Sequence, residues 1–429
     1  MGGGILQLVI KGKMDTYLSG NPEFSFFKAV YRRHTNFSIE SIRQQITGKG
    51  IGERLIKSKL SRVGDLIGKM SLEVKLFRGD ARNISETGTY LNWTNNTGHA
   101  FLKECEIKIG RQTIEKHTSK WLDIYNELYD KDEQEWIGLN KHPSKYGYFK
   151  KGNRNEDPQY LKLYIPLHFW FCDNPGLYLP IISINKHDVE IHMLVRSVEH
   201  LFNLDGQLAF SNNEPDIELW CDYIFLDEDE KKKYILEKKA YLIQQVQVYE
   251  TNMKLINEIK FYHPIKQLIW VVQERTVNIQ SGNGSSDMNA IANISGSSQD
   301  NKHDYFNYQA NGQGNKEVIY GVNSYESFRT AKLKLNGIDR FYERDASYFR
   351  LLQPLNSDLK IPGKHIYMYS FCLNPKEYQP SGSCNFSLID TAEMVFTTNH
   401  NYTNEILYIY AINYNVLVFS SGMAGLVYK

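Results

Sequence analysis

The sequence predicts an all-β protein made of two related halves, and three observations lead to this prediction. Stretches in which apolar and polar residues alternate recur along the chain, which is the pattern of strands with one buried and one solvated face. Aromatic residues make up 13% of the 429 residues, with 29 Tyr and 21 Phe against 12 Pro, and aromatic side chains suit a pleated, half-buried surface. A ten-residue motif also occurs twice, at positions 200 residues apart.

Alternating stretches separated by turn residues indicate the strands of a sandwich or barrel. They lie at residues 105–110, 161–171, 188–192, 217–221, 241–248, 260–272, 331–335, 366–371, 392–397 and 406–419. A charged stretch at residues 227–239 departs from the pattern, because acids precede bases as a helix favours. Asp227 and Lys231, and likewise Glu228 and Lys232, are spaced for i,i+4 ion pairs. We expect this helix to join the two halves.

The repeated motif supports a duplication. Residues 171–180 (FCDNPGLYLP) match residues 371–380 (FCLNPKEYQP) at six of ten positions. Both copies follow a strand-like stretch, which favours a duplicated β-domain of about 200 residues per copy. Residues 278–323 contain 21 Gly, Ser or Asn among 46 residues, and loops of this length are usually functional or disordered. We expect this stretch to be an excursion that stands out from the scaffold.

Charge and composition exclude several classes of protein. Lys and Arg number 50 against 49 Asp and Glu, whereas proteins that bind phosphate backbones usually carry a basic excess. Lys28, Arg32 and Arg33 lie among aromatic residues and could stack on nucleic acid, but we favour an interpretation as core aromatics and interface bases. Neither a secretory signal nor an apolar run of about 18 residues is present. The five cysteines are widely spaced and are interpreted as buried thiols.

No catalytic, cofactor or metal motif is visible. The chain lacks the P-loop and G-x-S-x-G patterns, and its 12 histidines form neither H-x-H nor H-E-x-x-H. We therefore predict no catalytic residue, no cofactor and no metal site. Asn283 and Asn293 are sequons within residues 278–323 and are candidate glycosylation sites.

Four separated stretches resemble, in order, motifs of the major capsid proteins of nucleocytoplasmic large DNA viruses, a double jelly-roll family. They are residues 20–37 (GNPEFSFFKAVYRRHTNF), 169–180 (FWFCDNPGLYLP), 335–341 (LNGIDRF) and 379–390 (QPSGSCNFSLID). Leu388 is a departure, since the family often has Arg there. The motif residues to which the resemblance gives structural roles are Asn21, Pro22, Phe27, Arg32, Arg33, Asn174, Pro175, Asn336, Gly337, Arg340, Pro380, Gly382, Asn385, Phe386 and Asp390.

The resemblance implies two tandem eight-stranded jelly-roll sandwiches with a short linker helix and long outer loops. Residues 1–24 would be an N-terminal arm and residues 25–225 the first jelly roll. Residues 226–240 would form the linker helix. Residues 241–429 would form the second jelly roll, with a long exposed loop at residues 278–323.

The function implied is structural and non-catalytic. The chain would trimerise into pseudo-hexameric capsomers that tile an icosahedral shell, assembled in the host cytoplasm and located in the virion. Its partners would be itself, neighbouring capsomers, minor capsid and penton proteins, and proteins of an internal membrane, and its outer loops could meet the host surface. The alternatives are a jelly-roll carbohydrate-binding, lectin-like protein and a cupin-like metalloenzyme, of which the second lacks the expected histidine pattern.

Overall fold

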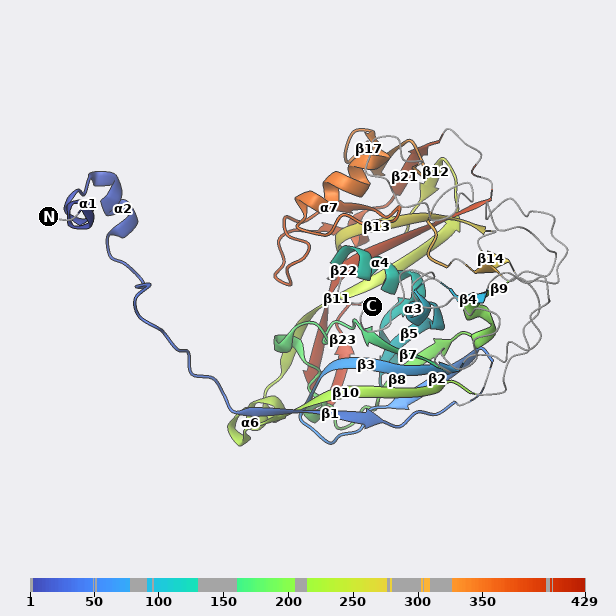
Figure 1. Cartoon of the computed structure of the whole chain (residues 1–429), viewed down its shortest axis with the longest axis horizontal. Coiled ribbons are helices and arrows are strands. Elements are labelled where there is room, and N and C mark those ends of the chain that lie inside the picture. Colours follow the sequence, from blue (N-terminus) through green and yellow to red (C-terminus); the bar gives the residue numbers. More distant parts are fainter. Residues whose placement is uncertain are drawn as a thin grey trace. The chain divides into compact units, whose positions relative to one another are not determined.

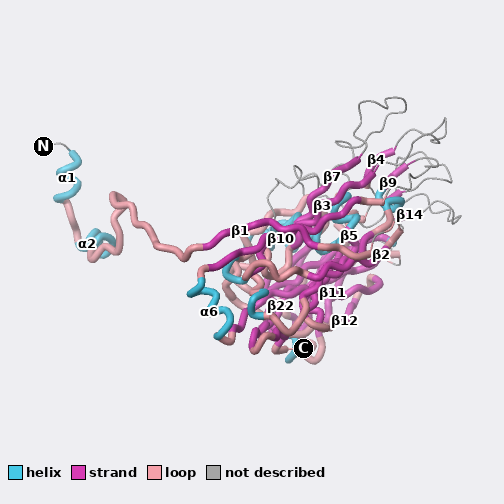
Figure 2. The backbone as a smooth tube through the Cα atoms, turned by 90° about the horizontal axis from the view of Figure 1, so that it is seen from below, coloured by secondary structure: helices cyan, strands magenta, loops and turns pink. Residues whose placement is uncertain are grey.

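Figure 1 shows the chain in the computed structural model, and Figure 2 shows that strands make up most of its regular structure. The structure describes residues 3–48, 50, 52–77, 91–94, 96–129, 160–204, 214–275, 278–279, 302–303, 305–308, 326–398, 402 and 404–428. The chain divides into two compact units, Met1–Phe37 and Ser38–Lys429.

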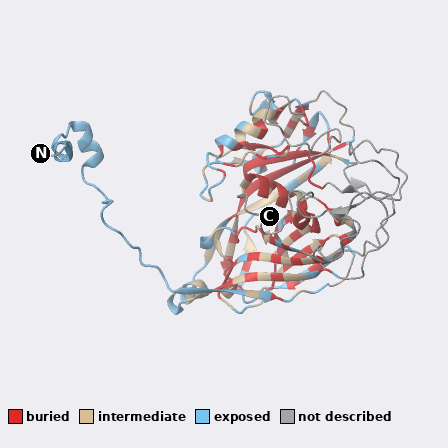
Figure 3. Cartoon of the chain, viewed as in Figure 1, coloured by how far each residue is buried: buried red, intermediate tan, exposed pale blue. Residues whose placement is uncertain are grey.

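The first unit is short and mainly helical or extended. It holds α1 (Gly3–Val9) and α2 (Lys13–Ser19) and then continues as irregular chain. The backbone amide of Gly12 donates to Oδ2 of Asp15, in the first turn of α2, at 2.8 Å. Figure 3 colours the described part of this unit as exposed, so its apolar side chains are not buried within it.

Eight strands of the second unit form a first sandwich. They are β1 (Phe37–Gln44), β2 (Arg54–Lys59), β3 (Leu66–Phe77), β5 (Leu102–Ile109), β6 (Gln112–Thr118), β7 (Tyr160–Leu167), β8 (Val189–Val195) and β10 (Asp216–Leu226). One sheet has the order β1-β10-β3-β7 and the other the order β2-β8-β5-β6. Counted along the chain, the first sheet holds strands one, eight, three and six in that order. The second sheet holds strands two, seven, four and five.

Eight later strands repeat the same arrangement. They are β11 (Lys239–Asn252), β12 (Ile256–Glu258), β13 (Pro264–Glu274), β16 (Thr330–Leu335), β17 (Ile338–Asp339), β19 (Tyr367–Ser370), β21 (Ala392–Thr397) and β22 (Glu405–Ser420). Their sheets have the orders β11-β22-β13-β19 and β12-β21-β16-β17, and neighbouring strands in both are antiparallel. Two antiparallel four-stranded sheets with this connectivity form a jelly roll. The prediction of two tandem eight-stranded jelly rolls is therefore confirmed.

Shorter elements complete the two rolls. In the first they are β4 (Leu91–Trp93), α3 (Thr97–Phe101), α4 (Ser119–Tyr129), η3 (Pro175–Leu177), η4 (Ile181–Ser183), η5 (Val198–Leu201) and β9 (Phe202–Leu204). In the second they are β14 (Asn278–Ile279), β15 (Lys302–His303), β18 (Arg344–Asp345), η8 (Tyr348–Leu352), α7 (Gln353–Asn356), β20 (Cys384–Asn385), η9 (Phe386–Leu388) and β23 (Met423–Leu426). The sequence did not indicate α4, nor the strands β1, β2, β3, β6 and β12.

The charged stretch between the rolls forms α6 (Glu228–Leu236), which is shorter than the expected residues 227–239. The side chain of Asp227 caps it by accepting from the amide of Glu228 at 2.8 Å. The expected i,i+4 pairs are absent from the ion pairs of the described residues. Lys231 instead reaches Asp65 of the first roll at 3.3 Å, because the helix packs on that roll and a buried carboxylate is available there.

The two rolls share a hydrophobic core, and the second roll has a further core of its own. The outer face of the sheet β11-β22-β13-β19 packs on α4 and on the chain after β7. The rings of Trp121 and Tyr410 lie 5.5 Å apart, and those of Trp170 and Tyr241 lie 6.3 Å apart. Sharing a core fixes the orientation of one roll against the other.

The expectation of an exposed loop at residues 278–323 does not hold throughout. Most of this stretch lies outside the described residues, but residues 305–308 are buried, with Phe306 at 0% and Tyr308 at 1% exposure. Nε2 of the Gln273 side chain donates to the carbonyl oxygens of Tyr305 and Asn307 at 2.9 and 3.1 Å. The apolar and aromatic side chains at this point enter the shared core, which anchors the middle of the stretch.

Candidate functional site

The opening motif lies in exposed chain of the first unit. Asn21 adopts a left-handed conformation (φ 50°) after α2, and Pro22 follows it. Such a turn is what Asn followed by Pro favours. Phe27 is 99% exposed, and Arg32 and Arg33 are also exposed. The interpretation of the aromatic residues in this motif as core is therefore wrong, and exposed aromatic rings are chemically suited to contact with another macromolecule.

The first copy of the repeated motif builds a turn after β7. Oδ1 of Asn174 accepts a hydrogen bond from the amide of Gly176 at 2.9 Å. Pro175 starts the short helix η3, where its ring suits the backbone angle required. Asn174 and Pro175 therefore specify a local backbone geometry.

The two motifs of the second roll's later part meet at a hairpin. Asn336 and Gly337 both have positive φ (50° and 79°) between β16 and β17, so the hairpin predicted from this dipeptide is confirmed. Oδ1 of Asn336 accepts from the amides of Asp390 and Thr391, each at 3.0 Å. One asparagine thus forms the turn and ties residues 335–341 to residues 379–390.

Pro380 ends the second copy of the repeat, and Gly382 lies in the connection that follows it. Gly382 has φ 143°, and a Cβ atom there would lie 2.9 Å from the carbonyl oxygen of Phe371. Only glycine fits a position with both this backbone angle and this close approach. Pro380 is exposed two residues earlier.

A third cluster surrounds Phe386, which is 3% exposed. Its ring lies 5.9 Å from that of Phe371, and the guanidinium of Arg340 lies 6.0 Å from the Phe371 ring. Oδ1 of Asn385 accepts from the amide of Ser387 at 3.0 Å and so caps η9. Arg340, Asn385 and Phe386 thus hold the turns that follow β19 against β13.

A buried polar network between the two rolls was missed by the sequence analysis. Asp123 on α4 is 0% exposed, and its Oδ1 lies 2.6 Å from Nζ of Lys364 in the second roll. The hydroxyl of Tyr308 donates to Oδ2 of Asp123 at 2.9 Å, and Nδ2 of Asn96 donates to Oδ1 at 2.8 Å. Burial, and then the neighbouring Asp123, raise the pKa of Tyr308 well above its usual value, so it stays a donor. Lys364 lies 241 residues from Asp123, and no local pattern connects them.

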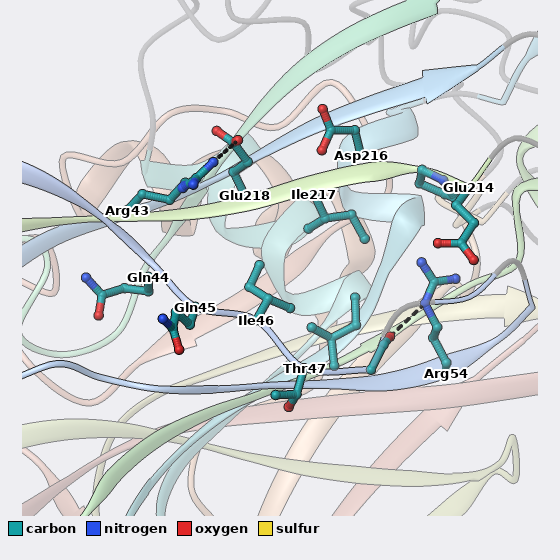
Figure 4. A pocket seen from close by; sticks show the side chains of 13 residues that line it. Arg43, Gln44, Gln45, Ile46, Thr47, Arg54, Glu214, Asp216, Ile217 and Glu218 are labelled. Atoms are coloured by element: carbon teal, nitrogen blue, oxygen red, sulfur yellow. Dashed lines mark hydrogen bonds and ion pairs between the residues drawn. The ribbon is translucent and has the colours of Figure 1, made fainter.

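A hollow of about 840 Å³ opens beside β1 and β2, which are edge strands of the two sheets of the first roll (Figure 4). Arg43 pairs with Glu218 at 2.8 Å, and Nε of Arg54 donates to the carbonyl oxygen of Gly48 at 3.1 Å. Burial lowers the pKa of Arg54, and nearby Glu214 opposes that effect. The charges that line this hollow largely neutralise one another.

In the described part of the chain, His, Cys, Asp and Glu side chains form no group of three or more that could hold a metal ion. Within the same residues, no helix has the length and apolarity to cross a membrane. Cys105, Cys172 and Cys221 are buried, which raises the pKa of each thiol, whereas Cys372 and Cys384 are half-buried. The interpretation of all five as buried thiols is therefore wrong for the last two, which lie in a surface connection.

The sequons Asn283 and Asn293 lie outside the described residues. The other motif residues form three separate groups, in the first unit, after β7, and around the hairpin and η9 of the second roll. Their geometry is that of turns and caps, and their roles in an assembly stay predictions.

Comparison with known proteins gives one consistent result. The model of the "Major capsid protein N-terminus" family matches residues 25–227, and that of the "Large eukaryotic DNA virus major capsid protein" family matches residues 230–425. The major capsid protein of Pyramimonas orientalis virus is 34% identical, and the alignment covers 100% of both chains. That of Phaeocystis pouchetii virus is 32% identical, again with 100% of both chains covered.

A solved structure agrees. A chain of the quasi-atomic model of the PBCV-1 virus capsid superposes with a TM-score of 0.73 and 30% identity, covering 94% of this chain and 100% of that one. The Faustovirus major capsid protein, at 14% identity and a TM-score of 0.68, shares the fold. The lectin-like alternative gains no support from these relatives. The chain belongs to the family of major capsid proteins of large eukaryotic DNA viruses, and its role is that of a structural component of the virion capsid.

Proposed function

We propose that three copies of the chain form a capsomer with pseudo-sixfold outline, and that such capsomers tile an icosahedral shell. The observation that carries this proposal is the repetition of one eight-stranded connectivity in two rolls that share a core. A chain with two similar rolls in a fixed orientation presents two similar sides, so a threefold assembly presents six. The similarity to a chain of the PBCV-1 virus capsid supports the same arrangement.

The near-balance of 50 basic and 49 acidic residues suits close packing of many copies, because strongly charged subunits would repel one another. The same balance supports a shell that encloses a genome without binding it directly. The chain acts without catalysis or cofactor in this proposal, and assembly takes place in the host cytoplasm.

The family-model matches and the element order support the proposed division of the chain. Residues 1–24 act as an arm that contacts neighbouring capsomers, minor capsid and penton proteins, or proteins of an internal membrane. Residues 25–225 and 241–429 are the two rolls, and residues 226–240 join them. The outer part of residues 278–323 faces away from the shell and can meet the host surface. The motif residues keep the turns between strands in shape for these contacts.

The mass of the purified protein in solution tests the proposal. Light scattering should give a particle of three times 49.9 kDa. A monomer that is retained on immobilised sugars would overturn the proposal in favour of a lectin-like protein. Stoichiometric zinc or iron in the purified protein would instead favour a metalloenzyme.

A further inference from the structure

The segment that precedes the second roll docks on the first roll. Helix α6 leads directly into β11 and packs on the short helix η4. Oγ of Ser183 in η4 donates to the carbonyl oxygen of Tyr234 at 2.7 Å, and Nζ of Lys231 lies 3.3 Å from Asp65. Oδ2 of Asp65 also accepts from the amide of Leu226 at 2.8 Å. One surface of the first roll, formed by Asp65 and η4, therefore holds the chain that leads into the next roll.

The second roll has a surface with the same construction. In the first roll Ile67 pairs with Leu179, and the amide of Ile182 donates to the carbonyl oxygen of Asp65 at 3.1 Å. In the second roll Ile265 pairs with Cys384. Two residues before Ile265, the carbonyl oxygen of His263 accepts from the amide of Phe386 at 3.1 Å. In both rolls a short helix, η4 or η9, follows this pairing.

The two surfaces differ in what covers them. Around η4, Ile181 and Ile184 belong to the core, and α6 lies against the helix through the bond from Ser183 to Tyr234. Around η9, Leu388 is 79% exposed and the neighbouring Tyr262 is 62% exposed. Large apolar side chains at such exposure mark a surface suited to a partner. The second roll therefore carries an uncovered equivalent of the surface that α6 occupies on the first.

The chain that precedes the first roll has matching chemistry. Phe26, Phe27 and Tyr31 are 88%, 99% and 88% exposed, and they lie shortly before β1 as Tyr234 lies shortly before β11. Aromatic side chains of this kind are frequent anchors of protein interfaces. The chain between α2 and β1 comprises residues 20–36 and can span about 50 Å when extended, which is long enough to reach an adjacent subunit.

We propose that the segment preceding β1 of one copy, including Phe27 and Tyr31, docks on the surface formed by Tyr262 and η9 in the second roll of a neighbouring copy. Within residues 1–429 the first roll precedes the second, and the segment that holds Phe27 and Tyr31 precedes the first. In a closed ring of copies, the second roll of the neighbouring copy would adjoin the first roll, as the first roll adjoins the second within one chain. The contact would then repeat, between chains, what α6 does within one chain. The inference rests on the proposed ring of copies.

Disulfide trapping in the assembled full-length protein tests the docking. Chains that carry Tyr31→Cys are co-assembled with chains that carry Leu388→Cys and are then mildly oxidised. We expect a covalent dimer of the two chains in an amount about tenfold above that of a control, because docking raises the effective concentration of the two thiols. The control pairs Tyr31→Cys with Ile256→Cys, a residue of β12 in the other sheet of the second roll that is 56% exposed.

The outcomes separate this inference from the proposed function. Equal dimer yields for Leu388→Cys and Ile256→Cys would overturn the docking. So would a disulfide that forms only within a chain carrying both Tyr31→Cys and Leu388→Cys, since the segment would then fold back on its own copy. If the particle mass is that of a trimer in these samples, the proposed ring of copies survives. A monomeric mass would overturn both proposals.

Discussion

The two jelly rolls share one connectivity, but their corresponding sheets meet different surroundings. In the sheet β1-β10-β3-β7, buried and partly exposed residues alternate, and the outer face carries ion pairs such as Lys162 with Glu73 at 2.7 Å and Lys75 with Asp216 at 3.2 Å. In the sheet β11-β22-β13-β19, the central strands are buried on nearly every residue. The corresponding sheets of the two rolls therefore differ, because the first has one face exposed to solvent and the second is enclosed on both faces.

The difference shows that the interface between the two rolls is reflected in the residue pattern of the strands that form it. Strands enclosed on both faces lose the alternation of polar and apolar residues and become continuous apolar runs. Two asparagines remain within the run of β22, and both have hydrogen-bond partners. Nδ2 of Asn415 donates to Oε1 of Gln245 at 2.9 Å, and Oδ1 of Asn413 accepts from Nε2 of Gln247 at 3.0 Å, both across to the neighbouring β11.

A charge placed on the enclosed face should have the largest effect. Ile269 on β13 is 0% exposed and belongs to the shared core. We expect Ile269→Glu to lower the free energy of unfolding by about 5 kcal/mol, because the carboxylate would be buried without a partner. The control Tyr164→Glu on β7, where the residue is 37% exposed, should cost about 0.5 kcal/mol. Urea unfolding measures both, and equal losses would contradict the difference between the sheets.

Ion pairs should follow the same division. Asp123→Ala removes the nearest ion-pair partner of Lys364 at the junction of the rolls and leaves Glu127 at 4.0 Å, and we expect a loss of about 4 kcal/mol. Asp216→Ala removes the partner of Lys75 on the solvent-exposed face of the sheet β1-β10-β3-β7 and should lower the free energy of unfolding by about 0.5 kcal/mol. Thermal unfolding of the two variants gives the comparison. A small effect for Asp123→Ala would mean that water reaches Lys364.

Acid should weaken the second roll through His365, which is 2% exposed. Burial lowers its pKa to about 4, an effect that nearby Glu326 opposes and Arg350 reinforces. Between pH 6.5 and 4 the unfolded chain binds a proton that the folded chain does not, so stability falls as the pH drops through this window. The fall should amount to about 3 kcal/mol. Unfolding of His365→Gln as a function of pH should lack this part of the slope, and an unchanged slope would refute the assignment.

Added methyl groups should have different effects at two glycines, one within the first copy of the repeated motif and one just after the second copy. Gly382→Ala in the second roll meets both a φ of 143° and the carbonyl oxygen of Phe371, and we expect a loss of about 2 kcal/mol. Gly176→Ala in the first roll meets only Oδ1 of Asn174 at 3.4 Å and should leave stability within about 0.5 kcal/mol. Denaturant midpoints of the two variants measure the two effects on stability. An unchanged midpoint for Gly382→Ala would show that the connection can shift.

Local patterns in the sequence predicted much of the fold. Alternation located β16, β21 and most of the longer strands, and the Asn336-Gly337 dipeptide located a hairpin, because both signals depend on neighbouring residues. The strand β3 was missed although Met70, Leu72 and Val74 alternate as buried residues, so the signal was available. The strand β1 is exposed along most of its length and carries little such signal.

Long-range contacts could not be predicted in this way. The pairing of Asp123 with Lys364, the choice of Asp65 as the partner of Lys231, and the burial of residues 305–308 all depend on how the two rolls pack. A stretch rich in Gly, Ser and Asn gives no sign that its middle enters a core. The meeting of two separate motifs at Asn336 likewise depends on tertiary structure.

The shared core has a consequence for the cooperativity of the chain. Two domains joined only by a linker can open one at a time, whereas rolls that bury apolar surface against each other lose that surface together. Calorimetry of residues 38–429, which form one compact unit, should therefore record a single transition. In a shell, each chain would then transmit load as one rigid block, and any yielding under pressure would begin at the contacts between chains.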